Sequence, residues 1–119
     1  MHELSITEHL LSLTLRHAEA AGASRVTALN LVIGEFASVV DESLQFYWDF
    51  VTKGTIAENA TLHFDRVPGM FQCSDCEHRF GMAEFEGRCP RCGGSHTTVI
   101  DGTQFSLASI EIEEANGDR

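Results

Sequence analysis

The chain has 119 residues, 43% of them hydrophobic, which suffices for the core of one small domain with an appendage. Its 18 acidic residues outnumber 8 Lys and Arg residues and give a net charge of −10. A chain this acidic repels phosphate backbones, which argues against a nucleic-acid partner. No apolar run approaches the roughly 18 residues that a membrane span needs, so no membrane association is expected.

The first three residues, Met1, His2 and Glu3, bring several nitrogen donors close together. The α-amine of Met1 and the amide and imidazole nitrogens of His2 can chelate one ion, and nitrogen donors in a plane suit Ni(II) or Cu(II). Glu3 offers a fourth ligand, either its amide nitrogen or its carboxylate. A histidine near a chain end is also common without any metal role, so the spacing alone leaves both interpretations open.

A helix is predicted after this terminus. Ser5 and Glu8 fit a capping box, with Ser5 as the N-cap and Glu8 reaching back to it, and Gly22 is expected to end the helix. Residues at helical spacing form its buried stripe, namely Ile6, Leu10, Leu13 and His17, widened by Leu11, Leu15 and Ala18. Such a cap would hold Met1 to Glu3 near one place.

Two further elements follow. Residues 25–33 alternate in polarity and predict a strand that ends at Gly34. Residues 41–53 predict a second helix with Asp41 as its N-cap and a stripe of Leu44, Tyr47, Trp48 and Val51. Its aromatic residues, which include Phe46 and Phe50, are too many for one buried face, so the surplus is a candidate partner-binding patch.

Strands are also predicted at 61–67, before the break at Pro68-Gly69, and at about 103–113, where the apolar parity switches after Leu107 and indicates a bulge or burial on both faces. We expect these strands to pair in one sheet, with the segment between them inserted. The expected fold is α+β, with two helices on one face of a three-stranded sheet and an inserted zinc-ribbon-like module. We divide the chain into a discontinuous α/β domain of residues 1–67 and 97–114 that carries the terminal metal site, a module of residues 68–96, and a disordered tail of residues 115–119.

All four cysteines lie in that module, as the CxxC pairs Cys73/Cys76 and Cys89/Cys92. Each CxxC turn aims two thiolates at one point, and two such turns can close a tetrahedral shell around Zn²⁺ with bonds of about 2.3 Å. The second pair is followed by glycines that suit this turn, whereas the first pair has none. Four thiolates leave no position for water, so the zinc would be structural rather than catalytic.

Iron, two disulfides and two redox dithiols are the alternatives at these cysteines. Glu3 and Glu8 stand where a secretory signal would be apolar, so we expect a cytoplasmic chain with reduced thiols. Iron suits four thiolates as zinc does, which leaves that choice open. We interpret His78 and His96 as surface or outer-shell residues, or as a pH-sensitive element beside the metal. No catalytic constellation is present, so we do not expect an enzyme.

Several features together resemble the HypA/HybF family, whose members insert nickel during NiFe-hydrogenase maturation. They are the N-terminal Met-His-Glu, the short α/β body, the CxxC…CxxC insertion and the phrases Gly34-Glu35-Phe36 and Thr52-Lys53-Gly54-Thr55. The resemblance implies transported Ni²⁺ on the Met1 amine, His2 and Glu3, and structural Zn²⁺ on Cys73, Cys76, Cys89 and Cys92.

The resemblance also implies partners, namely a HypB-type GTPase and the large-subunit precursor of the hydrogenase, and some relatives serve urease maturation. Two other classes compete with this metallochaperone interpretation. A zinc-ribbon adaptor that only binds other macromolecules predicts zinc alone and indifference to loss of His2. A rubredoxin-like electron carrier predicts bound iron with a one-electron couple.

Overall fold

A computed structural model describes the backbone of residues 2–114 and the side chains from Glu3 to Glu114, so the tail predicted to be disordered lies outside the described residues. The chain folds as two compact units. Unit 1 contains the residues up to Leu31, Ser38–Asp65 and the segment from Ser106 onward, and unit 2 contains Val32–Ala37 and Arg66–Phe105. No helix within residues 2–114 combines the length and the apolarity of a membrane span.

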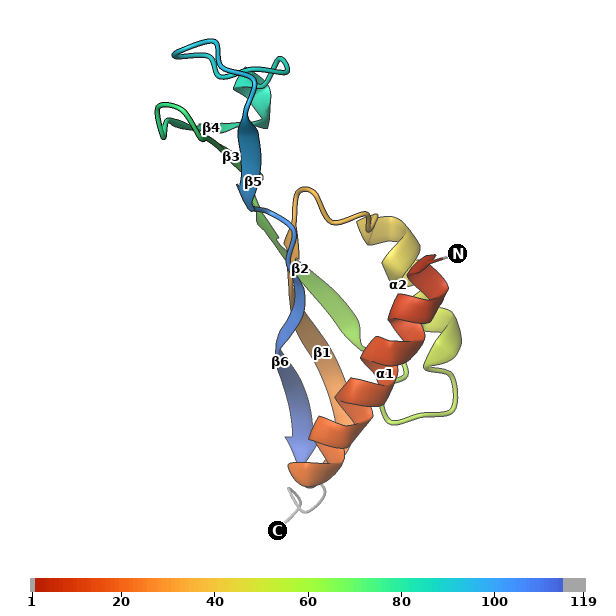
Figure 1. The fold of residues 1–119 in the computed structure, drawn as a ribbon. Coiled ribbons are helices and arrows are strands. Elements are labelled where there is room, and N and C mark those ends of the chain that lie inside the picture. The colour runs from red at the N-terminus through yellow and green to blue at the C-terminus, as the bar shows by residue number, and fades with distance from the viewer. Residues whose placement is uncertain (1, 115–119) are drawn as a thin grey trace. The chain divides into compact units, whose positions relative to one another are not determined.

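Unit 1 is built on a three-stranded sheet with two helices on one face (Figure 1). Its elements are α1 (His2–Ala20), β1 (Ala23–Gly34), α2 (Asp41–Val51), β2 (Thr61–Val67) and β6 (Phe105–Glu114), and the strand order is β2-β1-β6. This confirms the predicted fold class. The two outer strands lie in one sheet as expected, but each pairs with β1 rather than with the other.

The core of unit 1 lies between the helices and the sheet. The apolar side chains that are at least nine-tenths buried there include Leu10, Ala18, Val26, Leu29, Leu31, Leu44, Trp48 and Leu62. Both helices present one face to this core, because their buried residues recur at helical spacing. In α1 that face is formed by Thr7, Leu10, Thr14 and Ala18, whereas His17, which we placed in the stripe, is exposed.

Both predicted helix caps are wrong. α1 already begins at His2, which places Ser5 inside the first turns, and the Thr7 hydroxyl donates to the Glu3 carbonyl within the helix. In α2 the N-cap is Val40, which makes no side-chain cap, and Asp41 is the first helical residue. The end of α1 agrees with the sequence, since Gly22 lies two residues after the last helical residue, Ala20, and has a φ of 71°.

Strand β6 shows the predicted change of parity. Phe105 and Leu107 are half-buried, and then the half-buried positions become Ile110 and Ile112, so the side-chain alternation shifts by one residue across Ala108 and Ser109. A shift of this kind is what a bulge produces. Residues Ala108 and Ser109 are both exposed, which is inconsistent with burial on both faces at that point.

Unit 2 contains a second antiparallel sheet that the sequence did not predict. Its strands are β3 (Met70–Cys73), β4 (Arg79–Gly81) and β5 (Thr97–Asp101), in the order β4-β3-β5, and a short 3-10 helix, η1 (Met82–Glu84), follows β4. The register pairs Phe71 with Phe80 across β3 and β4, and Cys73 with Thr97 across β3 and β5. The first cysteine therefore ends a strand that is paired on both sides.

Three glycines of unit 2, namely Gly34, Gly69 and Gly102, lie in close contact with neighbouring groups of the same unit. A Cβ atom on Gly34 would overlap the Gly102 carbonyl group, and one on Gly69 would overlap the Phe36 ring. Gly102 itself has a φ of 100°, which L side chains rarely adopt. The Phe36 amide donates to the Gly102 carbonyl at 2.7 Å, so this close approach is also hydrogen bonded.

Candidate metal centre

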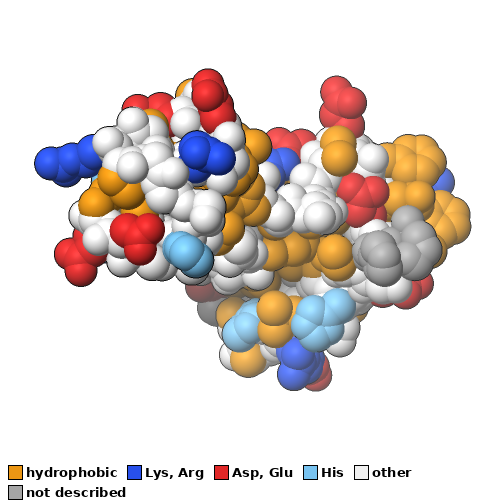
Figure 2. All heavy atoms as spheres, turned by 45° about the horizontal axis from the view of Figure 1, so that its top comes forward, with side chains coloured by type: hydrophobic (Ala, Val, Ile, Leu, Met, Phe, Trp, Pro, Cys, Tyr) orange, Lys and Arg blue, Asp and Glu red, His pale blue; other side chains and the backbone are white. Residues whose placement is uncertain are grey.

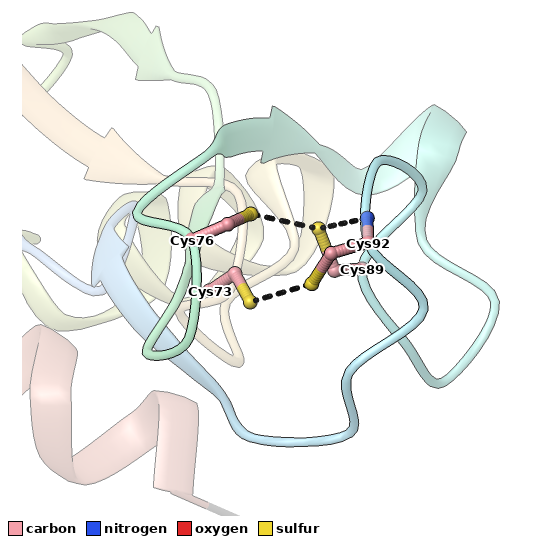
Figure 3. Close-up of side chains that lie close together, drawn as sticks. All are labelled: Cys73, Cys76, Cys89 and Cys92. Atoms are coloured by element: carbon pink, nitrogen blue, oxygen red, sulfur yellow. Dashed lines mark hydrogen bonds between the residues drawn. The ribbon is translucent and has the colours of Figure 1, made fainter.

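The four cysteine sulfurs lie close together at one end of unit 2 (Figure 3). The Sγ atoms of Cys73 and Cys92 are 3.5 Å apart, those of Cys76 and Cys89 are 3.7 Å apart, and all four lie within 4.8 Å of one another. None of the cysteines forms a disulfide. The structure thus brings together all four thiols that the sequence singled out.

These separations fit a tetrahedral metal site. Four sulfurs at about 2.3 Å from one ion stand about 3.8 Å from each other, which is near the observed Sγ–Sγ distances. Cys73 and Cys89 are buried, Cys76 is half-buried and Cys92 is exposed, so the cluster has a protected side and a side open to solvent. A donor set of four thiolates suits Zn²⁺ or iron.

The first CxxC turn is formed where β3 ends. The Glu77 amide donates to the Cys73 carbonyl at 2.9 Å, and the Asp75 amide points at the Cys73 sulfur at 3.3 Å. No glycine follows this pair, which is why its turn was unclear from the sequence. Glu77 instead adopts the left-handed conformation, with a φ of 65°, at a cost of about 1–2 kcal/mol.

The second CxxC turn repeats this design with glycines. Gly93 takes a φ of 78°, its amide donates to the Cys89 carbonyl at 2.9 Å, and the Gly94 amide points at the Cys92 sulfur at 3.4 Å. The Arg91 amide points at the Cys89 sulfur at 3.3 Å. Backbone N–H groups aimed at sulfur in both turns favour the thiolate form that a metal requires.

These contacts give the thiols of Cys89 and Cys92 different pKa values. Burial raises the pKa of Cys89, but the amides of Cys92 and Arg91 outweigh it and lower that pKa to about 7. For Cys92, the Gly94 amide lowers the pKa, but the thiols of Cys73 and Cys76 outweigh it and raise that pKa to about 12. Without a metal, the Cys89 thiol therefore loses its proton at a lower pH than the Cys92 thiol does.

A layer of aromatic rings packs against the cysteines. Phe71 stacks on Phe85 with ring centroids 4.3 Å apart and on Phe80 at 5.5 Å, and Phe36 packs against Phe71 at 5.3 Å. Cys73 and Cys89 belong to the same buried group. No sequence pattern predicted this layer, although phenylalanines stand near both cysteine pairs.

The two histidines near the cysteines have different surroundings. His78 is half-buried, and its ring stacks on Phe80 with centroids 5.9 Å apart. His96 has a side chain that is 78% exposed, and its Nδ1 atom lies 3.9 Å from Asp75 Oδ2. A contact this exposed and this long contributes little stability.

The predicted nickel ligands lie in unit 1 and only partly within the described residues. Met1 lies outside them, and His2 is the first residue of α1, with a side chain that also lies outside them. Glu3 is described, and its carboxylate accepts a hydrogen bond of 2.9 Å from the Val40 amide at the start of α2. Glu3 therefore links the two helices, a role that no local sequence pattern indicates.

The fold and the site define a class of small α+β proteins with a four-thiol module inserted between two strands of the main sheet. The family model described as "Hydrogenase/urease nickel incorporation, metallochaperone, hypA" matches residues 1–112. This chain belongs to the HypA family.

Curated relatives match along almost their whole length. The hydrogenase maturation factor HypA of Dehalococcoides mccartyi is 42% identical over 114 residues, which are 96% of each chain. HypA of Caldanaerobacter subterraneus is 39% identical and is covered completely, with 95% of this chain aligned. The relatives are named as maturation factors rather than as enzymes.

Solved structures of the family share the fold. The Ni metallochaperone HypA of Helicobacter pylori aligns with a TM-score of 0.65 at 20% identity, covering 94% of this chain and 97% of that one. A second structure of a HypA protein aligns with a TM-score of 0.71 at 23% identity, covering 94% and 96%.

Proposed function

We propose that this chain binds Ni(II) at its N-terminus and delivers it to the large-subunit precursor of a NiFe hydrogenase in the cytoplasm, while Cys73, Cys76, Cys89 and Cys92 hold a structural Zn²⁺. The observation that carries the proposal is the family match over residues 1–112, because it includes both the terminus and the four-thiol module. The proposed partners also include a HypB-type GTPase and proteins of urease maturation.

The zinc assignment is supported by the donor set. The four sulfurs, which lie within 4.8 Å of one another, would close the coordination shell of one ion and leave no position for a reacting molecule. Zinc would tie the two CxxC turns together and add folding free energy to a small module whose core is a single aromatic layer. Iron in the same shell would give a coloured protein with a one-electron couple, so the visible absorption spectrum of the purified protein distinguishes iron from zinc.

The nickel assignment uses the Met1 amine, the His2 amide and imidazole, and Glu3 as ligands. The Glu3 carboxylate is already held by the Val40 amide, so we assign the ligand of Glu3 to its backbone nitrogen. The Met1 amine and the His2 imidazole must be neutral to bind nickel, and each amide nitrogen must lose its proton. Nickel affinity therefore falls as the pH is lowered. A site at a chain end is accessible to a recipient protein, which suits delivery.

These ligands do not select nickel by themselves. By the Irving–Williams order, Cu(II) binds the same nitrogen donors more tightly than Ni(II). Selection of nickel must then come from metal supply and from contacts with the protein partners. The surface around the terminus, which protein partners would contact, is therefore part of the proposed function.

The proposal is tested in the host cell by replacing the gene with a His2→Ala variant. Hydrogenase activity and the nickel content of the purified large subunit should both be lost, although the variant accumulates and retains zinc. His9→Ala is the matched control, because His9 is an exposed histidine two turns further along α1. Full activity with His2→Ala would favour the alternative, a zinc-ribbon interaction adaptor with no nickel role.

A further inference from the structure

Helix α2 carries two large aromatic side chains that the core of unit 1 does not use. Phe46 is 68% exposed and Phe50 is 66% exposed, whereas Leu44 and Trp48 on the opposite face are buried. Residues four apart lie on the same face of a helix, so these two rings form one ridge. We call Phe46 and Phe50 the α2 ridge. Hydrophobic side chains gather at the right of Figure 2, on the side of unit 1 where Figure 1 labels α2.

The ridge is preordered for binding. The Phe46 ring packs edge-on against Tyr47, with centroids 5.4 Å apart and an interplanar angle of 73°. A ring that is already held loses little conformational freedom when a partner covers it. Phe side chains can each bury about 150–250 Å² of surface, and exposed apolar side chains that are grouped rather than scattered mark interaction sites.

The border of the ridge is mainly acidic. Glu42 and Asp49 are exposed on the same side of α2, and Lys53 is the cation that follows the helix. The whole chain carries a net charge of −10, so two copies would repel each other on approach. A partner that presents an apolar groove edged with Lys or Arg would be complementary to this border, in the manner of a helix lying in a groove.

The ridge also lies near the terminus that carries the proposed nickel ligands. The Glu3 carboxylate contacts the Val40 amide, and Phe46 is six residues further along, which is about 9 Å of helix rise. A protein seated on the ridge is thereby within reach of the metal held by residues 1–3. Metal exchange between two proteins requires such proximity.

From these observations we propose that the α2 ridge is the docking surface for the hydrogenase large-subunit precursor, which meets it with an apolar groove bordered by basic residues. The proposal rests on the proposed function, because the nickel recipient is the partner that must reach the terminus. It assigns affinity to Phe46 and Phe50, and orientation and rate of association to Glu42 and Asp49.

The test measures binding of the purified precursor to the zinc-loaded chain by biolayer interferometry. The variant Phe46→Ser/Phe50→Ser should bind at least about tenfold more weakly for each lost ring, since buried aromatic anchors dominate interfaces. The control is Val99→Ser/Ile100→Ser, which removes apolar side chains that are 47% and 40% exposed in unit 2. It should bind like the native chain.

A second variant guards against loss of folding in the first. Glu42→Lys/Asp49→Lys keeps both rings, and it should slow association and reverse the salt dependence of the rate. Unchanged binding in both ridge variants, equal loss in the control, or no binding of the precursor by the native chain would overturn the proposal. Sedimentation of a stable dimer that Phe46→Ser/Phe50→Ser abolishes would do so as well, because a second copy would then occupy the ridge.

Nickel calorimetry on the same samples separates this proposal from the one on which it rests. The ridge variants should bind nickel as the native chain does, because they leave residues 1–3 intact. Normal nickel affinity with lost precursor binding is the result we expect. Absence of nickel binding in the native chain, with precursor binding still dependent on the ridge, would remove the nickel function and leave the docking surface standing.

Discussion

The Glu3 carboxylate accepts a hydrogen bond of 2.9 Å from the Val40 amide, which joins the first turn of α1 to the start of α2. Val40 is the N-cap of α2 and provides no side-chain cap of its own. An anion at a helix N-terminus is favourable because free amides and the helix dipole meet there. Glu3 thus fixes the position from which the chain end emerges.

Replacing Glu3 tests this link and the ligand assignment together. Glu3→Ala should lower the free energy of unfolding by about 1 kcal/mol, and Glu3→Gln by less, because an amide oxygen can still accept from Val40. Denaturant unfolding followed by Trp48 fluorescence measures both values. Nickel affinity should change less than about tenfold in Glu3→Gln, since the ligand is the backbone nitrogen. A loss of nickel binding as complete as in His2→Ala would make the carboxylate the ligand instead.

The Glu3 contact also explains why the start of α1 could not be predicted. Ser5 and Glu8 satisfy a capping-box pattern, but a pattern over four residues does not include a carboxylate bonded to an amide 37 positions away. Similarly, Thr7 and Thr14 are buried in α1 while His17 is exposed, because packing against the sheet and α2 selects the face. The sequence located the strands of the main sheet well, since their apolar alternation is strong.

The second sheet was harder to foresee. Strands β3, β4 and β5 are three to five residues long, which is too short for an alternation of polarity to stand out in the sequence. The cysteine spacing predicted the cluster itself, since two CxxC turns can aim four thiols at one point. It could not predict that Glu77 would take the left-handed conformation that a glycine usually supplies.

Removal of the metal should affect unit 2 and spare unit 1. A strong chelator takes away a contribution of about 10–16 kcal/mol seen in small zinc modules, so the amides of β3, β4 and β5 should lose protection from hydrogen exchange. Trp48, the single tryptophan, is buried in unit 1 and should keep its emission maximum. A red shift of that emission on chelation would mean that unit 1 depends on the metal too.

Proton release on zinc binding should depend on pH through Cys89. Its pKa of about 7 lies below the ordinary thiol value of 9.0, so the folded module favours its thiolate. This contribution to stability is present above pH 9 and is lost as the pH falls through about 7. Zinc should therefore release about one proton more per chain at pH 6 than at pH 8. Calorimetry in buffers of different ionisation enthalpy measures the number, and equal release at both values would refute the lowered pKa.

The contact between Gly34 and Gly102 in unit 2 should not tolerate an added methyl group. Gly34→Ala pushes a Cβ atom into the Gly102 carbonyl and should cost about 1–3 kcal/mol or more, as overpacking of a rigid backbone does. Gly81→Ala is the control, because its Cβ would make only an ordinary contact of 3.8 Å with Gly69. Hydrogen exchange of the β3 amides measures the local stability of unit 2 in both variants. Equal protection in the two variants would contradict the expected clash.

The most direct test of nickel binding at the terminus is a calorimetric Ni²⁺ titration of the zinc-loaded chain with a free Met1 amine. His2→Ala and a version extended by two residues before Met1 are titrated in parallel. We expect one nickel per chain with a dissociation constant near about 1 μM, equivalent to about −8 kcal/mol, and no such site in either altered chain. Equal binding by all three would show that Met1, His2 and Glu3 do not hold the metal.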